Sequence, residues 1–342
     1  MKILYAIQGT GNGHVSRARD IIPELQRYGQ VDVLLSGYQV DMDLPFPVKY
    51  RLKGLSFIFG KKGGVSVLKT IKKLRPFRFL QDVFSLPVHK YDLIVNDFEP
   101  VAAWACRWSG VPCISLSHQA AVLHPAAPKP GVNGWVGRLI LNHYAPCDDY
   151  YGFHFERYGS NVFTPVVRKQ IMQLPVADNG HYTVYLPAYD DDKLLSILSR
   201  VPHAKWQVFS KHNKAAITQG NVSIVPVSND AFVNSLATCT GALLGAGFEG
   251  PSEALWLKKK LMVVPMTAQY EQQCNAAALE SLGVPVLQHL DSKSVETIKN
   301  WIAHESNVQL SFSSTAAADA VAMMMDAHLQ RVMQQESGLS AI

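Results

Sequence analysis

The sequence contains no apolar run close to the roughly 20 residues that a membrane-spanning helix needs, so we do not expect an integral membrane protein. Its five cysteines are an odd number without C-x-x-C spacing, which argues against a disulfide framework or a structural zinc site. The N-terminal apolar run stops at Gln8 and is too short for a signal peptide. A cytoplasmic protein of 342 residues, long enough for two domains, is therefore the expectation.

Two cofactor fingerprints are also missing. The loop G-T-G-N-G at 9–13 lacks the G-x-G-x-x-G spacing of dinucleotide-binding proteins, and no acidic residue ends the next predicted strand at 31–35. No D-x-D pair stands in a plausible metal position, since 190–192 is typical of a helix-capping run. The net charge of +5 is too small for this length to indicate a nucleic-acid partner. We therefore expect no cofactor, no metal ion and no nucleic acid.

Short apolar runs bounded by turn residues alternate with helical patterns in two successive sets. This alternation predicts an α/β protein with two doubly wound, Rossmann-like domains that face each other across a cleft. The expected boundaries are an N-terminal domain at 1–165, a linker at 166–180, a C-terminal domain at 181–325, and a helix or tail at 326–342 that can return to the N-terminal domain. A stretch at 120–137, rich in proline, glycine and alanine, is interpreted as a loop lining the crevice.

Titratable side chains follow several predicted strands of the first domain. His14 lies where the first glycine loop enters a helix, Asp97 and Glu99 follow one strand, and His118 follows the next. Because the carboxyl ends of parallel strands meet at one sheet edge, these residues should gather there. An imidazole at that edge suits acid–base chemistry, although a lone histidine is more often a packing residue. The carboxylates are compatible with a general base, an acceptor ligand or a helix N-cap.

Residues 49–78 contain ten lysines or arginines and no acidic residue, with phenylalanines interleaved. This composition is typical of a surface that meets anionic lipid headgroups or a phosphorylated acceptor. An ordinary solvated face is equally compatible with it.

The stretch 241–278 predicts a buried strand, a glycine-rich turn, a helix, a second strand and a second helix. The glycines at 245, 247 and 250 allow close backbone approach, and the N-H groups of the following helix attract phosphate. Glu253 in that helix either favours the helix dipole or holds the hydroxyls of a ribose. A plain strand-to-helix turn is the alternative.

Two stretches carry a family resemblance. One is G-T-G-N-G-H at 9–14 with Arg17 behind it; the other is G-A-G-F-E-G-P-S-E at 245–253, followed by P-M-T-A-Q-Y-E-Q-Q-C-N-A at 265–276. With these motifs the chain resembles the GT-B glycosyltransferases. It most resembles the branch containing the N-acetylglucosaminyltransferase that builds the peptidoglycan lipid intermediate and the diacylglycerol glycosyltransferases.

The resemblance implies that the N-terminal domain binds the acceptor and the C-terminal domain binds the nucleotide sugar. On the acceptor side of the cleft it implies Gly11, Asn12, Gly13 and Arg17. Glu99 and His118 are placed on the same side by their positions after predicted strands, because the motifs around them do not belong to the pattern of the peptidoglycan enzyme. On the donor side it implies Gly245, Ala246, Gly247, Phe248 and Glu249 at the diphosphate, Glu253 at the ribose, and Gln272 and Gln273 at the sugar.

The implied reaction moves a sugar from a UDP-linked donor to a hydroxyl of an envelope lipid or polysaccharide, with inversion and without a metal ion. His14 is the first candidate for the base, and Asp97 either orients it or acts directly. Peripheral attachment to the inner face of the cytoplasmic membrane follows from such an acceptor. Two other classes stay open: a nucleotide-sugar epimerase on the same fold, and a catalytically silent nucleotide- or glycan-binding protein.

Overall fold

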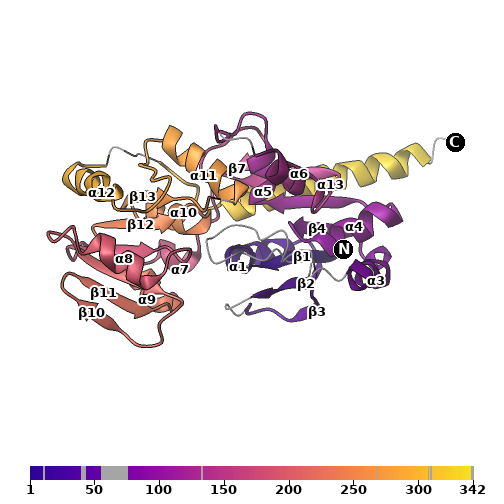
Figure 1. Cartoon of the computed structure of the whole chain (residues 1–342). Coiled ribbons are helices and arrows are strands. Elements are labelled where there is room, and N and C mark those ends of the chain that lie inside the picture. The colour runs from indigo at the N-terminus through magenta and orange to yellow at the C-terminus, as the bar shows by residue number, and fades with distance from the viewer. Residues whose placement is uncertain are drawn as a thin grey trace.

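The computed structural model describes residues 1–10, 12–39, 44–54, 76–131, 134–267, 269–306, 308 and 310–339. Gly11 and residues 55–75, which include most of the predicted basic surface, lie outside this range. Two parallel sheets are each covered by helices, as Figure 1 shows. This confirms the predicted α/β class with two doubly wound domains.

The N-terminal sheet has seven parallel strands in the order β3-β2-β1-β4-β5-β6-β7. Its elements are β1 (Lys2–Thr10), α1 (Gly13–Gln26), β2 (Gln30–Gln39), β3 (Val48–Leu52), α3 (Pro76–Ser85), the 3-10 turn η1 (Val88–Lys90), β4 (Leu93–Asp97), α4 (Pro100–Ser109), β5 (Cys113–Ser117), α5 (His118–Leu123), α6 (Trp135–His143), β6 (Asp149–Phe153) and β7 (Val162–Phe163). Strand β1 is central and buried from Ile3 to Ile7 because its neighbours and helices cover both faces. The carboxyl ends of β1, β4 and β5 therefore form one edge.

The C-terminal sheet has the order β10-β11-β9-β8-β12-β13, and only β10 runs antiparallel to its neighbour. The elements from the linker onward are α7 (Lys169–Met172), β8 (His181–Tyr185), α8 (Asp191–Leu198), β9 (Lys205–Ser210), β10 (Ile217–Gln219), β11 (Val222–Pro226), α9 (Asn229–Thr238), β12 (Gly241–Gly245), α10 (Glu249–Trp256), β13 (Lys260–Val264), α11 (Tyr270–Ser281), α12 (Ser294–Ala303) and α13 (Ala316–Leu339). Asp190 caps α8 by accepting from the backbone N-H of Lys193, as its sequence position predicts.

One local expectation was wrong. The predicted loop at 120–137 contains the end of α5 and the start of α6. The hydroxyl of Ser117 accepts from the N-H of Ala120 and starts α5 directly at the end of β5. In the C-terminal domain, the apolar run at 284–287 forms an isolated bridge between Val286 and Val263 and was not assigned in the sequence analysis.

The two domains are packed together rather than joined only by their linker. One apolar core includes residues from both domains, among them Phe153 of β6 and Phe248 before α10. Helix α13 lies against α1, β6 and β7 of the N-terminal domain, and Arg331 near its end pairs with Asp149. Figure 1 shows this helix running along the N-terminal domain and projecting beyond it. It is continuous through residues 325 and 326, where the sequence suggested a boundary.

Within the described ranges, none of the helices combines the length and the apolar character that a bilayer-spanning segment requires.

Candidate functional site

His14 and Asp97 come from distant stretches and lie in contact at the carboxyl edge of the N-terminal sheet. His14 is the second residue of α1, and Asp97 is the last residue of β4. The Nδ1 atom of His14 lies 2.9 Å from Oδ1 of Asp97. Asp97 is fully buried, whereas 13% of the His14 side chain is exposed. Asp97 therefore fixes the imidazole through Nδ1 and leaves Nε2 available for proton transfer.

Arg17 balances the charge around Asp97. Its Nη2 donates to both carboxylate oxygens of Asp97, at 2.8 and 2.9 Å. Burial acts to raise the pKa of Asp97, but the charges of Arg17 and His14 outweigh it and lower this pKa, so the carboxylate stays ionised. Burial acts to lower the pKa of His14, but the Asp97 carboxylate raises it above 6.5. His14 is thus a stronger base than an unperturbed histidine.

The turn between β12 and α10 places backbone N-H groups at an open position. Gly245 and Gly247 lie outside the left-handed backbone region, so conformation does not demand glycine there. A Cβ atom added at Gly247 would meet no heavy atom within 4 Å. Ala246 and Phe248 are buried and hold the turn from behind. The turn therefore leaves room for a ligand at the positive end of α10.

Glu249, the first residue of α10, reaches from this turn to the N-terminal domain. Its Oε1 accepts from Nη1 of Arg17 at 2.8 Å. A Cβ atom added at Gly13 would lie 2.4 Å from Oε2 of Glu249, so glycine is needed there for close approach. The cleft was predicted between the two domains. At that place Arg17 bonds to both Asp97 and Glu249, and it thus joins the His14–Asp97 pair to the glycine turn.

The model of glycosyl transferase family 1 matches residues 1–304. The chain belongs to this family. No curated protein sequence matches it.

Several solved structures share the fold at low sequence identity. MurG from Acinetobacter baumannii is 15% identical, with a TM-score of 0.54, over 94% of this chain and 95% of that one. Os79 from O. sativa, in complex with U2F and trichothecene, is 14% identical, with a TM-score of 0.60, over 97% and 94%. S. aureus MnaA with UDP is 12% identical, with a TM-score of 0.59, over 92% and 93%. The GT-B fold is therefore shown, whereas the branch within it stays a prediction.

Glu253, predicted to meet a ribose, is paired with the linker in this family member. Its two carboxylate oxygens accept from Nε and Nη2 of Arg168 at 2.5 and 2.9 Å. Burial raises the pKa of Glu253, and Arg168 opposes that rise. A ribose bonded to Glu253 would share its carboxylate with Arg168. The ribose role stays a prediction.

The two glutamines predicted to contact the sugar hold a neighbouring loop. Oε1 of Gln272 accepts from the N-H of Met266 at 3.0 Å, and Nε2 of Gln273 donates to the carbonyl of Met266 at 3.1 Å. Glu271, which the sequence analysis did not select, reaches across the domains instead. Its Oε2 accepts from Nε2 of Gln119 at 2.9 Å. The feature of the sequence that could have identified Glu271 is its position directly before the two glutamines.

Gln119 links the Glu271 carboxylate to His14. Nε2 of Gln119 lies 3.5 Å from Nε2 of His14, and Oε1 of Gln119 is buried with no partner among the described residues. The carbonyl oxygen of Gln119 is therefore a buried hydrogen-bond acceptor that no described residue uses.

His118 belongs to the domain contact and not to an open surface. Its Nδ1 lies 2.8 Å from the carbonyl of Phe153, and its Nε2 lies 2.8 Å from Oδ1 of Asn275. The ring stacks on Phe248 with centroids 3.8 Å apart and planes at 7°. Burial lowers the pKa of His118. Because only 1% of His118 is exposed, its first role is to join the domains.

Glu99 caps α4, which is one of the roles its sequence position allows. Its carboxylate accepts from the N-H groups of Val101 and Ala102 at 2.9 and 2.7 Å. Burial raises its pKa to about 7.

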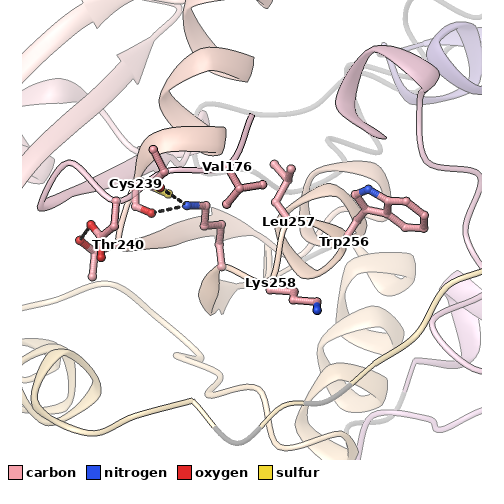
Figure 2. A pocket seen from close by; sticks show the side chains of 9 residues that line it. Val176, Cys239, Thr240, Trp256, Leu257 and Lys258 are labelled. Atoms are coloured by element: carbon pink, nitrogen blue, oxygen red, sulfur yellow. Dashed lines mark hydrogen bonds between the residues drawn. The ribbon is translucent and has the colours of Figure 1, made fainter. Parts of the chain in front are cut away.

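A separate hollow of about 600 Å³ lies at the end of the C-terminal sheet where β12 and β13 begin. The β12–α10 turn lies at the other end of these strands. Figure 2 shows Cys239, Thr240, Trp256 and Lys258 around it. The buried amine of Lys259 donates to the carbonyls of Ala177 and Cys239 there. None of the predicted site residues lines this hollow, so it is distinct from the candidate site.

Proposed function

We propose that this protein transfers a sugar from a UDP-linked donor to a hydroxyl of an envelope lipid or polysaccharide. The observation that carries the proposal is the His14–Asp97 pair, joined through Arg17 and Glu249 to the open glycine turn of the C-terminal domain. A base and a phosphate-binding helix end thus meet at one place. UDP is supported by the solved structure of MnaA, which has the same fold and contains UDP.

In the proposed reaction, Nε2 of His14 takes the proton of the acceptor hydroxyl. The acceptor oxygen forms a bond to the anomeric carbon while the bond from that carbon to the diphosphate oxygen breaks, which inverts the configuration. The N-H groups that open α10, at the positive end of the helix, stabilise the departing diphosphate. Because these groups supply positive charge, we expect turnover to persist in the presence of EDTA.

For donor recognition, we propose that Glu271 contacts the sugar hydroxyls and that Gln272 and Gln273 position its helix. The Glu271 carboxylate next to Gln119 and His14 supports this assignment. Glu271→Ala, and the double variant Gln272→Ala/Gln273→Ala, should weaken binding of the complete donor more than binding of UDP alone. Calorimetry with both ligands measures this difference, and equal losses would contradict a sugar contact.

Incubation of the purified protein with a panel of nucleotide sugars tests the function, with and without membrane lipid extract. We expect nucleoside diphosphate release that depends on the acceptor. An isomerised donor would instead identify an epimerase, and donor binding without turnover would identify a binding protein.

We place the protein at the inner face of the cytoplasmic membrane, since a lipid acceptor resides there. The basic composition of residues 49–78 supports this location. Reversal of Lys69, Lys72 and Lys73 to Glu should reduce binding to anionic liposomes; these lysines lie outside the described residues. Unchanged binding would remove the basic stretch from the proposal.

A further inference from the structure

Helix α3 turns an apolar face to solvent. Phe77, Leu80 and Phe84 recur at i, i+3 and i+7 and are 87%, 37% and 73% exposed. This spacing puts them on one side of the helix, whereas Val83 is buried in the core of the domain. Large aromatic side chains grouped on an exposed helix face are typical of an interaction surface.

Two further helices extend this surface. The ring of Phe84 stacks on Trp108 of α4, with centroids 5.1 Å apart and planes at 14°. On α6, Trp135 is 65% exposed and Leu139 is 51% exposed. A groove of about 450 Å³ runs between the three helices, and Phe79 and Leu139 are among its lining residues. Helices α3, α4 and α6 therefore share one apolar surface.

The charges on these helices indicate which partner the surface fits. Each helix carries one exposed arginine, namely Arg78, Arg107 and Arg138, against a single acidic residue, Asp82. The sequence from 49 to 75, directly before α3, adds nine lysines or arginines and no acid. Aromatic rings together with arginine suit the headgroup region of an anionic bilayer, where rings lie at the interface and cations meet lipid phosphates.

We propose that α3, α4 and α6 form the surface that docks this protein on an anionic lipid bilayer. Phe77, Phe84, Trp108 and Trp135 insert at headgroup level, and Arg78 and Arg107 contact lipid phosphates, whereas Arg138 lies against Tyr270 of the C-terminal domain. Figure 1 shows α3 and α4 at the end of the N-terminal domain that lies away from the C-terminal domain, so the C-terminal domain does not cover them.

The docking surface is also connected to the candidate site through the interior of the N-terminal domain. Tyr144 lines the groove and packs on Phe98, with ring centroids 4.9 Å apart, and Phe98 follows Asp97 in the chain. The hydroxyl of Tyr144 accepts from Nε2 of Gln8 at 2.6 Å on β1. Docking through this surface therefore holds His14 and Asp97 close to the headgroups. This consequence rests on the proposed transfer to a lipid, whereas the docking itself does not.

Co-sedimentation of the full-length protein with vesicles tests the surface. Vesicles of phosphatidylcholine mixed with phosphatidylglycerol should bind the protein, and vesicles of phosphatidylcholine alone should bind it more weakly. Phe77→Ser/Phe84→Ser should lower the partition coefficient by about 100-fold, because each buried ring contributes about tenfold. Arg78→Glu should lower it by about fivefold or more and weaken its dependence on salt. The matched control Val176→Ser/Ile217→Ser removes two exposed apolar residues elsewhere and should bind like the parent protein.

Two results would overturn the proposal. One is vesicle binding by Phe77→Ser/Phe84→Ser equal to that of the parent protein. The other is a dimer in sedimentation experiments that the same variant abolishes, since the surface would then join two copies of the chain. The docking variant should retain turnover on a detergent-soluble acceptor, and His14→Ala should retain vesicle binding. Failure of docking and failure of the proposed reaction are therefore distinguishable.

Discussion

Asp97 sets the orientation and the basicity of His14 at the candidate site. It holds Nδ1 of His14 at 2.9 Å and receives two hydrogen bonds from Arg17, all at a position with no solvent access. Tyr5 below it donates to Oδ2 at 3.4 Å. A carboxylate enclosed in this way cannot reach an acceptor hydroxyl. It orients the histidine and raises its basicity, so His14 is the better candidate for the base.

His14→Ala should lower kcat by about 10²- to 10⁴-fold, the usual contribution of a general base, and leave donor affinity unchanged. In the parent protein, kcat/KM should fall as the pH drops through the His14 pKa, because the protonated ring cannot accept a proton. Asp97→Asn removes the charge that raises this pKa, so that limb of the profile should move to lower pH. Steady-state kinetics across pH measures both effects. His203→Ala, an exposed histidine elsewhere, is the control. Full activity in His14→Ala would exclude it as the base.

Glu99 should make stability depend on pH. Its folded pKa of about 7 lies above the usual 4.5, so the folded state binds more protons between these values. Stability should therefore fall as pH rises from 4.5 to about 7, by up to about 3 kcal/mol, and then level off. In Glu99→Gln, which keeps an acceptor oxygen for the cap, this slope should be smaller. Urea unfolding at pH 4.5 and at pH 7 measures the change in stability of both proteins. An identical change in the parent protein and in Glu99→Gln would contradict a raised pKa for Glu99.

At the scale of elements, the β12–α10 turn differs from an ordinary strand-to-helix turn. Structure requires a glycine where φ is positive or where a close neighbour leaves no room for a Cβ atom, as Glu249 does at Gly13. Gly247 meets neither condition, and the space before it is open. A ligand that approaches the backbone, as proposed for the diphosphate, is therefore the reason we expect for glycine at this position.

Gly247→Ala should therefore weaken UDP binding by about tenfold or more, since the added methyl group projects where the diphosphate is proposed to lie. Folding stability should stay the same or rise by about 0.4–1 kcal/mol, because alanine restricts the unfolded chain. Gly180 is the converse control: its φ of +71° strains an alanine, so Gly180→Ala should lose stability and keep its affinity. Calorimetry measures UDP binding by the two variants, and thermal unfolding measures their stability. A Gly247→Ala protein that binds UDP normally would leave the turn with a structural role alone.

At the scale of the whole molecule, polar contacts join the domains around the site. Arg17 pairs with Glu249, Gln119 with Glu271, and His118 with Asn275. Arg168 of the linker pairs with Glu253. We expect a donor at the glycine turn to meet these contacts, and the arrangement of the domains should then depend on donor binding.

Arg168→Met should destabilise the protein by about 3–5 kcal/mol, because it leaves the Glu253 carboxylate buried without its partner. The double variant Arg168→Met/Glu253→Met removes both charges and should recover most of this loss. Denaturant unfolding of the single and double variants measures the recovery. If the double variant also binds UDP like the parent protein, Glu253 serves the linker and not a ribose.

The sequence by itself determined the class of the fold and the two stretches that face each other. Alternating apolar runs, glycine turns and caps are local, and each limits the backbone at its own position. They were sufficient for two doubly wound domains, for the β12–α10 turn and for His14 and Asp97 at strand ends. Tertiary structure alone decided the partners: Asp97 beneath His14, Arg168 on Glu253, His118 inside the domain contact, and Glu271 on Gln119. These pairs lie 83 and 85 residues apart, and 152 residues apart for Glu271 and Gln119, and no local pattern encodes which side chain meets which across such separations.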